Sequence, residues 1–160
     1  MPSKTRTSGF TLVELMIVIT LLAIVATIAT PGFTDMIERN RLQSQAEALR
    51  SFLLYARGEA VTQRSTVTVE TDDENAWVIE RDGTTIRQLE HNPELVTLRS
   101  SAETITFRSN GTATAATFTV CHDDNPTRGY FLEIQASGAT SLYLRGEKDA
   151  SHTVLDSCTL

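Results

Sequence analysis

One feature near the start of the chain constrains its structure more than any other. From Phe10 to Ala29 the sequence is almost continuously apolar, and Lys4 and Arg6 precede this run. A helix of that length is just able to cross a hydrocarbon core of about 30 Å, and basic residues before it favour a cytoplasmic N-terminus. A single carboxylate, that of Glu14, interrupts the run.

Glu14 separates three interpretations of this segment. A secretory signal peptide fits the basic start, and Thr27 and Ala29 resemble a small-x-small cleavage site. A plain transmembrane anchor fits the length. Both leave Glu14 unexplained, because a charge in lipid costs several kcal/mol, about 2.5 or more by insertion scales. The third interpretation is that Glu14 has a binding partner within the membrane.

The stretch GFTLVELMIVI, Gly9 to Ile19, resembles the processing site of type IV prepilins and type II secretion pseudopilins. The resemblance covers about thirty residues tightly and includes Pro31. It implies that a prepilin peptidase cleaves between Gly9 and Phe10 and methylates the new amine of Phe10. It also implies that Glu14 pairs with the Phe10 amine of a neighbouring pilin or pseudopilin during assembly. Two opposite charges are much less costly to bury as a pair than alone.

The expected organisation is a leader peptide at 1–9, a transmembrane helix at 10–31, an amphipathic helix at 32–62 and a β-rich extracytoplasmic head at 63–160. The second helix is predicted from apolar residues that recur at steps of three and four, which is the pattern of a helix packed against a sheet. These residues are Leu42, Ala46, Leu49, Leu53, Ala56 and Ala60.

Beyond residue 62 the pattern alternates with the period of strands. Strands are expected at 65–70, 75–81, 84–90, 94–99, 104–109, 115–122, 130–135 and 140–145, with tight turns at Asp82-Gly83, Asn110-Gly111 and 136–138. The fold class is therefore α+β, a long N-terminal helix packed on an antiparallel β-sheet head. Size and strand order resemble those of the FimT/GspH minor pilin group.

The two cysteines, Cys121 and Cys158, have neither the spacing nor the histidines of a metal site. In an oxidising compartment a disulfide is the expected state, contributing roughly 3–4 kcal/mol in the loop-closure model, and two buried free thiols are the alternative.

Charge bears on nucleic-acid binding. The chain has 14 Lys and Arg against 20 Asp and Glu, a net charge of -6. Some FimT-like pilins capture DNA through a basic C-terminal Gly-Arg-x-Arg motif, but here Gly138 is followed by Ala139 and Thr140. The candidate DNA-binding residues are Arg145, Lys148 and Arg128, and few phosphate contacts give little affinity.

No enzyme motif occurs, so neither catalytic residues nor a cofactor are expected. His91, His122 and His152 lack metal-ligand spacing, and Asp123, Asp124 and Asn125 are expected to form a polar turn rather than a calcium site.

The expected function is that of a minor type IV pilin, a structural subunit of an initiating or tip complex. Its expected location is the bacterial inner membrane, with a single pass and a periplasmic head, before incorporation into a pilus or pseudopilus. A type II secretion pseudopilin and a DNA-binding pilin of natural transformation are the alternatives.

Overall fold

The computed structural model describes residues 10–73 and 75–160, without the side chains of residues 28–31. It divides into two compact units, Met1–Glu38 and Arg39–Leu160, which are described separately. Helix α1, Leu12–Gln63, contributes its first part to one unit and its second part to the other.

Among the described residues, no single helix has the length and apolar composition needed to cross a membrane. Two helical segments, Leu12–Thr27 and Gly32–Gln63, meet those requirements only when taken together as a bent pair.

The second part of α1 buries the face that the sequence predicts. Leu42, Ala46, Leu49, Leu53, Ala56 and Ala60 are all fully buried. Steps of three and four residues place these side chains on one side of a helix, so the apolar stripe packs against the rest of the head. The predicted helix–sheet packing is confirmed.

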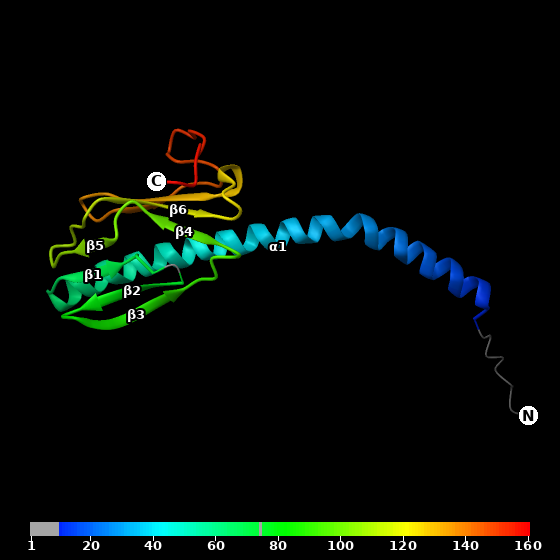
Figure 1. Cartoon of the computed structure of the whole chain (residues 1–160), viewed down its shortest axis with the longest axis horizontal. Coiled ribbons are helices and arrows are strands. Elements are labelled where there is room, and N and C mark those ends of the chain that lie inside the picture. Colours follow the sequence, from blue (N-terminus) through cyan, green and yellow to red (C-terminus); the bar gives the residue numbers. More distant parts are fainter. Residues whose placement is uncertain (1–9, 74) are drawn as a thin grey trace, which may run out of the picture. The chain divides into compact units, whose positions relative to one another are not determined.

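Within residues 10–73 and 75–160, eight strands form two antiparallel sheets. The first sheet has the order β3-β2-β1-β5, with β1 at Val67–Glu70, β2 at Ala76–Arg81, β3 at Thr84–Glu90 and β5 at Thr104–Phe107. The second has the order β4-β6-β7-β8, with β4 at Thr97–Ser100, β6 at Ala116–Cys121, β7 at Tyr130–Ile134 and β8 at Thr140–Leu142. Both sheets lie alongside the part of α1 that belongs to this unit (Figure 1). The α+β class is confirmed.

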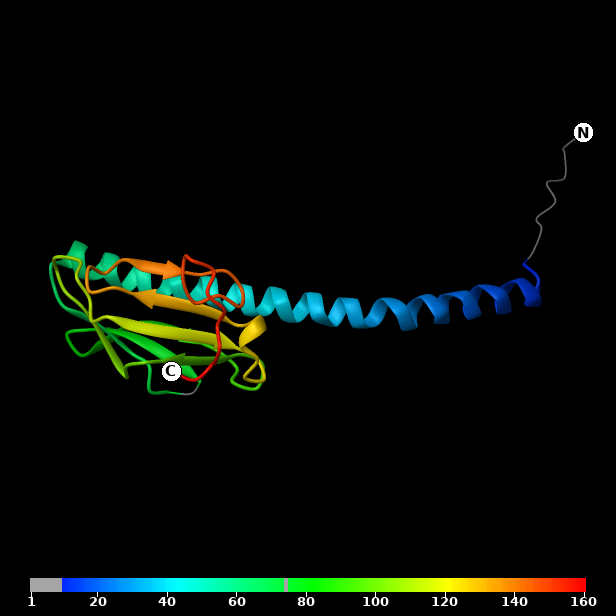
Figure 2. The ribbon, with the colours of Figure 1, turned by 90° about the horizontal axis from the view of Figure 1, so that it is seen from above.

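Aromatic packing connects the two sheets. Trp77 of β2 and Phe118 of β6 have ring centroids 5.9 Å apart, and both side chains are buried. They belong to one apolar cluster that includes the helix stripe and the inner faces of both sheets. The second sheet runs beside α1 in a perpendicular view as well (Figure 2).

The predicted turns have the backbone geometry that their residues favour. Asp82 and Gly83 both have positive φ, 53° and 73°, as a two-residue hairpin with a primed turn requires. Gly138 has φ 78° between β7 and β8. Asn110-Gly111 also forms a turn, with the Gly111 N–H bonded to the Arg108 carbonyl, but the strands around it continue into different sheets.

Two segments differ by three residues from the predicted strand bounds, and the other strands differ by two residues or fewer at either end. Residues 94–96 form a turn before β4, because the Asn92 carbonyl accepts the N–H groups of Leu95 and Val96. Strand β8 ends at Leu142 rather than continuing to 145, and the chain then turns back where the Glu147 N–H reaches the Leu144 carbonyl. A short 3-10 helix, Pro126–Arg128, was not predicted.

Candidate assembly site

The first turn of α1 is capped by a side chain. Thr11 Oγ1 accepts the backbone N–H of Glu14 at 3.2 Å, and the Thr11 carbonyl accepts the N–H of Leu15 at 3.2 Å. Thr11 is therefore the N-cap, and it satisfies a donor that would otherwise lack a partner at the helix start. Thr11 was not among the predicted site residues, although Thr-x-x-Glu is the sequence signature of a capping box.

Glu14 occupies the third position of the helix, where a negative charge interacts favourably with the helix dipole. Its side chain is exposed, and Phe10, four residues earlier, is 82% exposed. Gly9 and the proposed leader lie outside the described residues.

The apolar side chains that follow Phe10 are also uncovered in the single chain. An apolar surface of this extent on one helix indicates contact with lipid or with other helices. The residues exposed over this part of α1 include Leu12, Val13, Leu15, Met16, Ile17, Val18, Ile19, Leu21, Leu22, Ile24 and Val25.

Cys121 and Cys158 form a disulfide, as predicted, with Cα atoms 6.3 Å apart. The bond joins the C-terminal tail to strand β6. Thr119, a buried residue of β6, donates its hydroxyl to the Cys158 carbonyl at 2.7 Å. Leu155 of the tail is also buried, and its N–H bonds to the Gly146 carbonyl, so the tail is held at Leu155 as well as at Cys158.

The structure brings two of the three candidate DNA-binding residues together. Arg145 Nε donates to the Arg128 carbonyl at 3.1 Å. Lys148 lies in the following loop, where its ammonium pairs with Asp156 at 2.7 Å and lowers the pKa of that carboxyl. The Asp156 carboxylate offsets the Lys148 charge, so this pair adds little net positive charge to attract phosphates.

Arg57 is a structural residue that the sequence analysis missed. From α1, its Nε donates to the Gly111 carbonyl at 3.0 Å, and Nη2 donates to the Ser137 carbonyl at 3.3 Å. It thus ties the helix to the turn after β5 and to the turn between β7 and β8. These turns touch, since a Cβ on Gly138 would lie 2.0 Å from the Gly111 oxygen. No local signal in the sequence marks this contact, because its members are 54 and 80 residues apart.

Comparison with protein families gives two matches. Residues 4–30 match the prokaryotic N-terminal methylation motif. Residues 45–138, more than half of the chain, match the family described as type II transport protein GspH. The chain belongs to the GspH family of type IV pilin-like proteins.

Solved structures of this pilin-like family have the same fold. The type IV minor pilin FimU of Pseudomonas aeruginosa is 29% identical, with a TM-score of 0.62, over 76% of this chain and 97% of FimU. The minor pseudopilin EpsH of the Vibrio cholerae type 2 secretion system is 18% identical, with a TM-score of 0.55, over 66% of this chain and 98% of EpsH. No curated protein sequence matches the chain.

The first turn of α1 lies within the segment that matches the methylation motif. The pilin-like protein is a minor pilin or pseudopilin, a structural subunit that is incorporated into a type IV pilus or a type II secretion pseudopilus. The methylation motif covers Phe10, Thr11 and Glu14, so the capped turn and its carboxylate lie within the segment that the family shares.

Proposed function

We propose that this protein is a minor type IV pilin, a structural subunit of a pilus initiating or tip complex. The observation that supports the pilus over the secretion system is the likeness to FimU, which has 29% identity, whereas EpsH has 18% and supports the fold alone.

The proposed assembly step uses the first turn of α1. Cleavage after Gly9 leaves the amine of Phe10 as a cation four residues from Glu14, and the carboxylate of one subunit pairs with the amine of its neighbour. The Thr11 cap supports this step, because it fixes the start of the helix next to Phe10 and bonds the backbone N–H of Glu14. Burying each charge alone costs several kcal/mol, so an empty partner site favours the addition of a subunit.

The same proposal includes a membrane-anchored stage. The apolar run up to Ala29 holds the subunit in the inner membrane, with the leader on the cytoplasmic side and the head in the periplasm. The Cys121–Cys158 disulfide supports a head outside the cytoplasm, since such bonds persist in oxidising compartments.

A type II secretion pseudopilin is the second candidate, and the name of the matching family favours it. DNA reception has less support, because Lys148 is paired with Asp156 and Arg145 is bonded within the head.

Deletion of the gene in its host tests the choice between pilus and secretion system. Loss of twitching motility and surface pili, with protein secretion intact, is expected, and wild-type protein restores both. Loss of secretion with intact pili contradicts the proposal and supports the pseudopilin.

Processing is tested on the mature protein. Mass-spectrometric sequencing should find an N-methylated N-terminus at Phe10, and Gly9→Val should block cleavage, because a branched side chain replaces the glycine that the prepilin motif has there. A mature chain that begins at Thr30 would instead show an ordinary signal peptide.

A further inference from the structure

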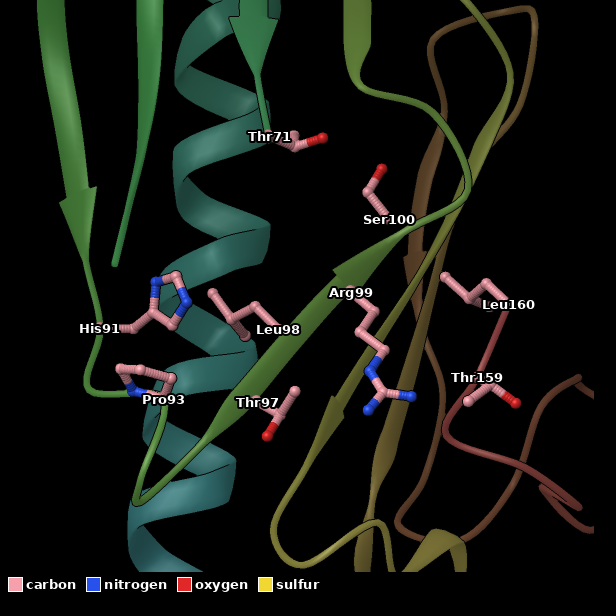
Figure 3. Close-up of a pocket in the computed structure, with 9 residues that line it drawn as sticks. All are labelled: Thr71, His91, Pro93, Thr97, Leu98, Arg99, Ser100, Thr159 and Leu160. Carbon is pink, nitrogen blue, oxygen red and sulfur yellow. The ribbon is translucent and has the colours of Figure 1, made fainter. Parts of the chain in front are cut away.

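A cleft of about 580 Å³ lies between the two sheets of the head. Residues from separate parts of the chain line it: Thr71 after β1, His91 after β3, Leu98, Arg99 and Ser100 of β4, and Leu160 of the tail. Figure 3 shows β4 crossing the view with His91 on one side and Leu160 on the other. A volume of this size is within the range of roughly 300–1,000 Å³ typical of binding sites.

Strand β4 presents an open edge to this cleft. Within the described part of the chain, β4 is the edge strand of its sheet and has β6 as its neighbour. The Ser101 N–H bonds to the Thr117 carbonyl, and the antiparallel register pairs Arg99 with Thr119. Because bonded pairs alternate in an antiparallel ladder, the N–H and C=O groups of Leu98 and Ser100 point away from β6, toward the cleft.

The ionisable side chains among the described residues that line the cleft are basic. The described lining residues with titratable side chains are Arg99 and His91, and none of these lining residues has an acidic side chain. This contrasts with the chain as a whole, which has 20 acidic and 14 basic residues. Arg99 Nη2 pairs with Asp124 at 2.9 Å, but a guanidinium has five N–H donors and can bind a second carboxylate.

We propose that this cleft binds an extended, acidic segment of a partner protein, which adds to the second sheet as a strand beside β4. Backbone hydrogen bonds to Leu98 and Ser100 hold the segment, and a carboxylate on it pairs with the Arg99 guanidinium. Strand addition is a general mode of peptide recognition in which backbone bonds give affinity and side-chain sites give specificity. An extended segment is favoured over a small molecule because the backbone groups of Leu98 and Ser100 that point away from β6 repeat at the two-residue spacing of a strand.

Amide hydrogen exchange on the full-length protein in detergent micelles tests the proposal. The probe is the synthetic peptide acetyl-Thr-Glu-Val-Glu-Thr-amide, and the comparison is its lysine analogue, acetyl-Thr-Lys-Val-Lys-Thr-amide. The glutamate peptide should slow exchange of the Leu98 and Ser100 amides by roughly tenfold, the equivalent of one net hydrogen bond. The amide of Arg99, which already faces β6, should not change.

Two matched variants separate the backbone bond from the side chain. Ser100→Pro removes the outward N–H without removing a bond to β6, since proline is tolerated on the free side of an edge strand. Ser100→Ala removes the hydroxyl, which contacts Ala102, and keeps the N–H. Peptide binding should be lost in Ser100→Pro and retained in Ser100→Ala, with the disulfide intact in both.

Charge is tested at the same cleft. Arg99→Glu should reverse the preference, so that the lysine peptide protects Leu98 and Ser100, whereas Arg108→Glu outside the cleft should leave the preference unchanged.

Three outcomes overturn the proposal. The first is equal protection of the Leu98 and Ser100 amides by both peptides in the wild-type protein. The second is the absence of protection of these two amides, whether or not the glutamate peptide binds. The third is protection of these amides in concentrated protein without peptide, if dilution removes that protection. The occupant of the cleft is then a second copy of this chain.

Discussion

Glu14 is a carboxylate on an otherwise apolar and exposed part of α1, and its proposed role is in assembly rather than in folding of the head. Glu14→Val should therefore be processed and should accumulate in the inner membrane, yet be depleted from sheared filaments. Glu14→Asp should give an intermediate level, because the charge remains but its reach is shorter. Quantitative immunoblots of membrane and sheared fractions measure this.

A wild-type level of Glu14→Val in filaments contradicts the pairing step for a subunit within the filament. A subunit at the very tip has no member ahead of it, so co-purification of Glu14→Val with other minor pilins should be measured in parallel.

Arg57 is predicted to stabilise the head, because it bonds two turns from different parts of the chain. Arg57→Ala should lower the free energy of unfolding by roughly 1.5 kcal/mol, the lower range for hydrogen bonds to a charged group, since Arg57 is half-buried. Arg57→Lys should recover only part of this loss. The charge and one hydrogen bond can remain, but an ammonium lacks the planar fork that reaches two carbonyls. Denaturant titration gives the values, and the exposed Arg108→Ala provides a control that should change stability by less than about 0.5 kcal/mol. Equal losses of stability in Arg57→Ala and Arg108→Ala would mean that the two hydrogen bonds of Arg57, the Arg57 clamp, add nothing specific to the stability of the head.

At the scale of elements, the C-terminal tail depends on its disulfide. Cys158→Ser should release the tail from β6 and destabilise the head by roughly 3–4 kcal/mol in the loop-closure model. Amide exchange should increase from Glu147 onward, whereas the buried part of α1 in the head should stay protected under native conditions. Continued protection of Leu155 in Cys158→Ser would show that packing alone holds the tail.

The loop between Glu147 and Asp156 is predicted to open in acid. The pKa of Asp149 is lowered below its ordinary value of 3.8 by bonds from Thr153 and Ser151, and that of Asp156 by the hydrogen bond from Lys148. A carboxyl with a lowered pKa stabilises the folded state above its unfolded pKa, and this contribution is lost as the pH falls through the folded pKa. Protection of the Ser151 and Thr153 amides, corrected for intrinsic exchange, should thus fall below about pH 4.

Asp149→Asn is the control for acid opening. The side-chain oxygen of the asparagine can still accept the N–H groups of Ser151 and Thr153, but the amide does not titrate. Protection of these amides from exchange should therefore depend less on pH than in the wild-type protein. An unchanged pH profile in Asp149→Asn would exclude Asp149 as the titrating group.

At the scale of the whole molecule, net charge predicts weak nucleic-acid binding. With a net charge of -6, and with Lys148 paired to Asp156, the protein should bind duplex DNA no tighter than about 10⁻⁴–10⁻⁶ M at physiological salt. Fluorescence anisotropy against salt concentration measures this. Sub-micromolar binding that is lost on Arg145→Ala with Lys148→Ala would make DNA reception the leading function.

Local sequence patterns were enough to predict much of this molecule. The stripe from Leu42 to Ala60 predicted the buried helix face, and Asp82-Gly83 predicted a hairpin, because both depend on periodicity and turn chemistry within a few residues. Gly9, Phe10 and Glu14 pointed to the pilin family for the same reason, since the processing motif is contiguous.

Contacts between distant residues were decided only by the tertiary structure. The division of the strands into two sheets, the Arg57 clamp and the cleft beside β4 join residues tens of positions apart, and no spacing rule connects them. The turn at Asn110-Gly111 illustrates the limit: its local geometry was predictable, but β5 pairs with β1 and β6 pairs with β4 and β7. Strand partners are chosen by packing of the whole head around α1, which a single sequence without its three-dimensional contacts does not specify.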